Sequence, residues 1–163
     1  MPTVLSAQRG LYFEEFEVGD RVISNGRTVT EADIVNFAGL SGDFNQIHTN
    51  AEFAARDTFG RRIAHGLLIQ AISTGLATAT GVIEGTVLAF REVHAKFSLP
   101  TYIGDTIHLE LEVIEKKAFA RLGGGNIHLK FNVINQDGQS VQRGEWVMLM
   151  KSRPQNNSAE SSA

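Results

Sequence analysis

Residues 66–80 read GLLIQAISTGLATAT, a helical pattern that is apolar on nearly every side. Its apolar members are Leu67, Leu68, Ile69, Ala71, Ile72, Leu76, Ala77 and Ala79. A helix that is apolar around its whole circumference belongs inside a protein. Gly81 follows as a suitable C-terminal stop. We therefore expect a helix over residues 66–80 that the rest of the chain covers.

Downstream of this helix the apolar residues recur with a period of two. This alternation predicts half-buried antiparallel strands over 107–113 and 127–133. Two further strands are expected over 86–97 and 141–150, the latter after the turn signal at 135–138. An antiparallel sheet with one apolar helix predicts an α+β fold in which a curved sheet wraps around the helix.

Two short helices are expected upstream. Thr30 and Asp33 approximate a capping box at the start of the first, and Gly39 to Gly42 ends it. Asn50 is a plausible N-cap for a second helix over 51–56.

Composition limits the class of protein. The 163 residues suffice for one domain with a core, and 42% are apolar. A net charge of −3 argues against a general nucleic-acid partner, and the polar interruptions of residues 63–82 argue against a membrane span. The chain has no cysteine, and its first ten residues resemble no secretory signal, so we expect a cytoplasmic protein. Residues 152–163 are rich in Ser and Asn and are predicted to be a disordered tail after a single domain over 1–151.

The Gly-rich stretch 37–48, FAGLSGDFNQIH, carries the chemistry. It places a carboxylate, Asp43, five residues before an imidazole, His48. Imidazole titrates near neutrality, so this pair can hold a water molecule and move protons in an addition or elimination. Asn45 could orient the pair or the water. The alternative is structural: Asp43 caps a turn, and His48 is a buried histidine bonded to backbone.

A second feature is the start of the apolar helix at His65-Gly66. Free backbone N–H groups and the helix dipole point outward there, and Gly66 allows a ligand oxygen to approach the backbone. A carbonyl placed there would have a developing enolate charge stabilised. A plain N-terminal turn remains the alternative.

These motifs carry a family resemblance. The pattern Phe37-x-x-Leu-Ser-Gly-Asp43-x-Asn-x-Ile-His48 resembles the signature of the MaoC-like (R)-specific enoyl-CoA hydratases, which are hotdog-fold dehydratases. The segments Ile63 to Leu68 and Leu99 to Asp105 resemble two further elements of that family. The likeness covers roughly residues 12–150. One departure is Gln46, where the family usually has proline, so the loop is expected to be freer.

The resemblance implies a hotdog domain that hydrates trans-2-enoyl-CoA to (R)-3-hydroxyacyl-CoA, or catalyses the reverse dehydration. Asp43 and His48 would activate water, and the Gly66 N–H would bind the thioester carbonyl. The expected neighbours of the substrate are Asn45, His65 and Thr74, although for Thr74 a hydroxyl bonded to a helix carbonyl is an equal alternative. Arg61 and Arg62 could meet the phosphates of coenzyme A, since arginine suits phosphate geometry, or could instead be solvated.

No metal or redox cofactor is implied, with coenzyme A entering only as part of the substrate. A metal site from Asp43, His48 and His65 lacks a closely spaced ligand pair such as His-x-His. The resemblance also implies a homodimer formed through sheet edges, or a larger assembly. Three rivals stay open: an acyl-carrier-protein dehydratase, a thioesterase, and a non-catalytic acyl-thioester-binding hotdog subunit.

Overall fold

A computed structural model describes residues 10–154. Residues 1–9 lie outside the described residues, and so do residues 155–163 of the tail predicted over 152–163. At the start of that tail, the Ser152 N–H donates to the Gly123 carbonyl and the Arg153 N–H donates to Glu14. The prediction of disorder from residue 152 is therefore wrong for these two residues, because both are bonded to the domain.

The predicted antiparallel sheet is confirmed. Four long strands, β3 (Val87–Phe97), β4 (Thr106–Phe119), β5 (Gly124–Ile134) and β6 (Ser140–Lys151), join two short ones, β1 (Arg21–Ile23) and β2 (Arg27–Thr28). The hydrogen-bonded order is β1-β4-β5-β6-β3, and β2 also pairs with β4. Every pairing is antiparallel. The strand β3 is therefore one edge of the sheet.

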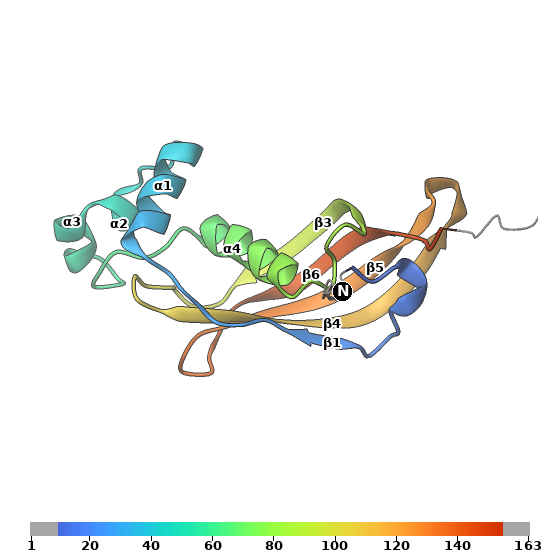
Figure 1. Cartoon of the computed structure of the whole chain (residues 1–163). Helices are drawn as coiled ribbons and strands as arrows, with labels where there is room; N and C mark the ends of the chain where they lie inside the picture. The colour runs from blue at the N-terminus through green and yellow to red at the C-terminus, as the bar shows by residue number, and fades with distance from the viewer. Residues whose placement is uncertain (1–9, 155–163) are drawn as a thin grey trace, which may run out of the picture.

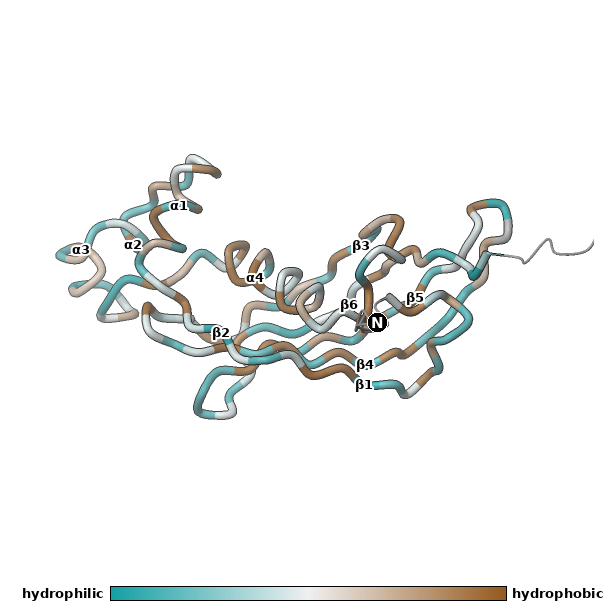
Figure 2. Tube along the Cα trace, in the orientation of Figure 1, coloured by the Kyte–Doolittle hydropathy of each residue, from teal (hydrophilic) through white to brown (hydrophobic). Residues whose placement is uncertain are grey.

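Helix α4 (Gly66–Ala79) lies along one face of this curved sheet (Figure 1). It ends one residue earlier than predicted, and Gly81 follows with a left-handed φ of 80°. Apolar residues run along α4 and alternate with polar ones along the strands, as Figure 2 shows. The core combines Leu68, Ile69, Ile72 and Leu76 of α4 with inward-facing strand residues such as Trp146.

One expectation about α4 is wrong. Its circumference is not wholly buried, since Leu67 is 65% exposed and Ala71 and Ala79 are also exposed. The sheet covers only one side of the helix, which is the arrangement expected of a two-layer domain. Periodicity identified the helix correctly, but it could not tell whether the second apolar side has a neighbour within the same chain.

Three further helices form a group beyond the end of the sheet (Figure 1). They are α1 (Glu31–Ser41), α2 (Gln46–Thr49) and α3 (Ala51–Arg56), while short 3-10 turns occupy Phe13–Glu15 and Ala120–Leu122. The Thr30–Asp33 capping box and the Asn50 N-cap are both confirmed. Among the described residues, no helix is long and apolar enough to cross a membrane.

Candidate active site

Asp43 and His48 lie in the α1–α3 group, at the side that faces the start of α4. Helix α1 ends at Gly42, which adopts a left-handed φ of 77° and turns the chain toward Asp43. The Asn45 N–H donates to Asp43 Oδ1 over 3.2 Å, and the Asn45 side chain caps α2 by accepting from the Ile47 N–H. The Asn45 backbone therefore orients the Asp43 carboxylate, while its side chain begins the helix that carries His48.

His48 is held by the segment before α4. Its Nδ1 bonds to the Ile63 carbonyl over 2.8 Å, and the Ile63 N–H returns a bond to the Ile47 carbonyl. A carbonyl only accepts, so His48 Nδ1 carries the proton and Nε2 keeps its lone pair. Burial lowers the pKa of His48 below its ordinary 6.5, with His65 contributing, although the Ile63 bond and Asp43 act in the opposite direction. The ring is therefore neutral at pH 7, with Nε2 available as a base.

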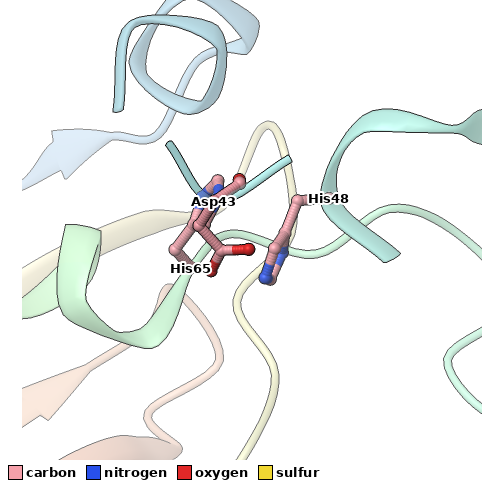
Figure 3. A group of neighbouring side chains, drawn as sticks. All are labelled: Asp43, His48 and His65. Atoms are coloured by element: carbon pink, nitrogen blue, oxygen red, sulfur yellow. The ribbon is translucent and has the colours of Figure 1, made fainter. Parts of the chain in front are cut away.

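His65 contacts both Asp43 and His48. Its Nε2 donates to the Asp43 backbone carbonyl over 2.9 Å, and its ring stacks on that of His48 with centroids 3.8 Å apart. Figure 3 shows the Asp43 carboxylate directed toward the His48 side, with His65 beside Asp43. His65 Nδ1 is buried and has no hydrogen-bond partner among the described residues. Thus His65, a predicted substrate neighbour, contacts both Asp43 and His48, the pair that we call the dyad.

These three side chains offer ligand atoms that all lie within 4.8 Å of one another. A shared metal ion would need lone pairs that converge on one point. Two of the ring nitrogens, His48 Nδ1 and His65 Nε2, are already bonded to carbonyl oxygens. The geometry therefore suits proton transfer better than metal binding.

A cavity of about 460 Å³ opens next to His48, within the usual size range of small-molecule sites. His48 and Gly66 line it together with apolar side chains from α4, from the segment between α3 and α4, and from the end of β3 and the segment that follows it. These apolar residues are Phe59, Ile63, Leu67, Ile69, Phe97, Leu99 and Pro100. Asp43 does not line the cavity itself, but its carboxylate lies within 4.8 Å of a ring nitrogen of His48, which does. The cavity can therefore take an apolar chain with its reactive end at His48.

Gly66 begins α4 at the wall of this cavity. In the described part of the chain no group accepts a hydrogen bond from the Gly66 N–H, and His65 provides no side-chain cap. A Cβ at this position would lie 2.7 Å from a ring carbon of Phe97, so only glycine fits beneath that ring without movement. The helix start thus presents a free donor to the cavity.

The remaining predicted neighbours lie elsewhere. The Thr74 hydroxyl donates to the Ala71 carbonyl of its own helix and is exposed, outside the residues that line the cavity. Arg62 makes a two-pronged ion pair with Glu31, and Arg61 stacks on the Tyr102 ring at 3.9 Å. Neither arginine lines the cavity. Their proposed contact with coenzyme A phosphates stays a prediction.

Sequence reasoning missed Phe97 and Gln142 as cavity residues and missed helix α2 altogether. Gln46 is the first residue of α2, where proline is also favoured, and its side chain accepts from Asn50 Nδ2 over 2.9 Å. The glutamine therefore links the starts of α2 and α3, which the sequence interpretation of a freer loop did not foresee. A four-residue helix is too short to give a periodic signal.

Comparison with known proteins identifies the family to which the chain belongs. A family model described as "MaoC like domain" matches residues 14–131, so the chain belongs to the MaoC-like domain family. The chain is 39% identical over 113 residues to 3-hydroxybutyryl-CoA dehydratase of Methylorubrum extorquens, covering 69% of each chain. It is 33% identical over 140 residues to the (R)-specific enoyl-CoA hydratase of Aeromonas caviae, covering 84% of this chain and 97% of that one.

Further matches include a much longer protein and two solved structures. Protein MaoC of Klebsiella aerogenes is 40% identical over 100 residues, but this chain covers only 30% of its length. The R-hydratase PhaJ1 structure from Pseudomonas aeruginosa superposes with a TM-score of 0.73 at 32% identity, covering 87% of this chain and 86% of that one. A Mycobacterium tuberculosis protein described as a double hotdog fold gives a TM-score of 0.78 at 19% identity, covering 90% of this chain and 46% of that one. The expected hotdog fold is thereby confirmed.

Proposed function

We propose that this protein catalyses the reversible hydration of a trans-2-enoyl-CoA to the (R)-3-hydroxyacyl-CoA. The observation that carries the proposal is the placement of two kinds of group around one cavity. A neutral His48 with a free Nε2, next to the Asp43 carboxylate, meets a helix start with a free Gly66 N–H. Proton transfer and enolate stabilisation are the two requirements of this reaction.

In the proposed reaction, His48 Nε2 and Asp43 hold a water molecule at C3 of the substrate. The water oxygen bonds to C3 as its proton passes to the dyad, and the electrons of the C2–C3 double bond move toward the thioester oxygen. That oxygen accepts from the Gly66 N–H. The enolate then reforms the carbonyl as C2 takes a proton from the dyad, so that one water has been added in total. Dehydration is the same sequence in reverse.

Asp43 supports this cycle electrostatically. Its negative charge raises the pKa of His48, against the lowering by burial, and so stabilises the imidazolium that forms as the water is deprotonated. The apolar cavity wall excludes water from the acyl chain. No step requires a metal or redox cofactor, and coenzyme A is part of the substrate. Two relatives whose names specify coenzyme A thioesters support this choice over an acyl-carrier-protein substrate.

The direct test is an assay of the purified protein with crotonyl-CoA, following loss of the conjugated enoyl absorbance. We expect hydration, and chiral analysis should give (R)-3-hydroxybutyryl-CoA. Parallel assays with crotonyl acyl carrier protein and longer enoyl-CoA substrates separate the rivals. A strong preference for the carrier protein would replace the substrate class, and no activity with any enoyl thioester would reject the proposal.

We also propose that the protein forms a homodimer through the outer edge of β3. This eleven-residue edge strand has no neighbour on its outer side among residues 10–154, and its backbone groups there are open to pairing. Several of its large apolar side chains are exposed, namely Leu88, Phe90, Val93 and Phe97. A second copy pairing at this edge would cover them and would adjoin the cavity, which Phe97 lines.

Sedimentation analysis tests the dimer. The wild-type protein is expected to sediment as a dimer, and Val93→Lys should weaken association at least tenfold, since it places a charge on the edge strand. The matched control is Val35→Lys, at an equally exposed position of α1 away from β3. A monomeric wild-type protein, or equal effects of both substitutions, would contradict the proposed interface.

A further inference from the structure

A chain of buried hydrogen bonds links the sheet to the first residue of α4. The Trp146 indole N–H of β6 donates to Gln70 Oε1 over 3.2 Å, and Gln70 Nε2 donates to Gln142 Oε1 over 3.1 Å. Gln142 Nε2 then donates to the Gly66 carbonyl over 2.8 Å. All three side chains are more than nine-tenths buried, with Trp146 wholly so. We call this chain the glutamine relay.

The direction of the glutamine relay is fixed by its two ends. An indole N–H can only donate, and a backbone carbonyl can only accept. Two amides between such groups have one orientation in which every link pairs a donor with an acceptor. Each amide oxygen therefore faces the Trp146 side, and each NH₂ faces Gly66. Bonds aligned in this way polarise one another, and reversing either amide would leave two buried links unmade.

The endpoint of the relay is the helix start that the proposed reaction uses. The Gly66 carbonyl belongs to the first peptide unit of α4, and a trans peptide directs its carbonyl and the following N–H in opposite directions. The N–H of that peptide unit is that of Leu67, so holding the Gly66 carbonyl fixes the peptide plane directly after Gly66 and, with it, the orientation of the first turn of α4. Gln142 itself lines the cavity, and it pairs across the sheet with Phe97, whose ring lies over Gly66.

We propose that Trp146, Gln70 and Gln142 are positioning residues that fix the Gly66–Leu67 peptide and so hold the first turn of α4, with its Gly66 N–H, in place for the substrate carbonyl. The inference rests on the proposed hydratase function for the use of that N–H. Apolar residues of similar size at 70 and 142 would fill the core without ordering the helix start. Neither glutamine touches the dyad, so the glutamine relay acts only on the Gly66 helix start, where the thioester carbonyl is proposed to bind.

The test has a structural arm and a kinetic arm. Gln142→Met keeps the length of the side chain but cannot donate to Gly66. We expect the amide resonances of Gly66 and Leu67 to shift and their hydrogen exchange to quicken. With crotonyl-CoA, kcat should fall about ten- to hundredfold with a smaller change in KM, because misplaced donors stabilise the transition state less. Asn126→Leu, which replaces a buried amide of β5 away from the cavity, should lower stability and leave kcat unchanged.

Gln142→Glu supplies a readout that a purely structural role would not give. The introduced carboxyl can donate to the Gly66 carbonyl when protonated but not when ionised, and burial raises its pKa. Activity of this variant should therefore fall as pH rises through that pKa. Protonation of His48 has the opposite sign, since it removes activity as pH falls. Activity plotted against pH should therefore give a narrow, bell-shaped curve for Gln142→Glu, whereas the activity of the wild-type protein stays high toward neutral pH.

The outcomes separate the two proposals. Unchanged Gly66 and Leu67 resonances in Gln142→Met, or unchanged kcat in both Gln142 variants of an active protein, would overturn the relay. If the wild-type protein hydrates no enoyl thioester, the hydratase proposal fails, and the resonances alone decide whether the relay orders the helix start.

Discussion

Asp43→Asn and His48→Gln should each lower kcat for enoyl-CoA hydration by about two to four orders of magnitude, the range that general acid–base groups supply. Both substitutions keep a local hydrogen bond. The asparagine retains an oxygen for the Asn45 N–H, and the glutamine retains a donor for the Ile63 carbonyl. The fold should therefore survive while the base is lost. Steady-state kinetics with crotonyl-CoA, together with circular dichroism and thermal melting, provides the measurement.

The double variant adds a sharper criterion. If Asp43 and His48 act on one water molecule, removing both should cost little more than removing either one. The control is Asp137→Asn in the β5–β6 turn, an exposed position away from the cavity. It should retain the wild-type rate. Full activity in either dyad variant would remove that residue from the proposed mechanism.

Gly66→Ala is expected to lower kcat/KM about ten- to hundredfold, because small displacements at a reacting centre are costly. The added Cβ would lie 2.7 and 2.8 Å from two ring carbons of Phe97. Phe97 is 53% exposed, so its ring can swing away without unfolding the protein. In doing so it moves into the cavity or pushes the helix start off its position. Kinetics across a series of enoyl-CoA chain lengths, with melting temperatures, measures both effects.

Two partner variants isolate the cause. Gly66→Ala combined with Phe97→Ala should regain part of the lost activity, since the added methyl group then meets no ring. Gly75→Ala lies in the same helix with nothing within 4 Å of the added carbon, and it should keep full activity with slightly greater stability. Wild-type kcat/KM in Gly66→Ala would show that the close packing of Phe97 on Gly66 has no part in catalysis.

Local signals in the sequence predicted most of the secondary structure. The Thr30–Asp33 capping box, the Asn50 cap and the Gly81 stop each depend on bonds within a few residues, so they can be recognised without a tertiary structure. The alternation of apolar and polar residues is also a local signal, and it predicted β4 and β5. Residue types and spacing within 37–48 indicated Asp43 and His48 before the resemblance to a known signature supported them, and the structure brings their ligand atoms within 4.8 Å of each other.

Contacts between distant segments could not be predicted in this way. The stacking of His65 on His48 and the bond from His65 to the Asp43 carbonyl join elements whose relative position depends on the whole fold. Gln70 and Gln142 are 72 residues apart, and two isolated glutamines on a helix and a strand form no motif. The exposed side of α4 could not be predicted from the sequence either. Hydrophobicity predicts that a side chain is buried, but it does not say which surface covers it.

The Gln46–Asn50 bond gives the segment from Asp43 to Asn50 a different kind of order from that of a proline at position 46. A pyrrolidine ring restricts the chain in the unfolded state as well, so it reduces the entropy lost on folding. A side-chain hydrogen bond exists only once α2 and α3 have formed, and it leaves the unfolded chain as free as before. The order that this bond contributes is therefore enthalpic in origin, and it weakens with heating more steeply than a covalent constraint would.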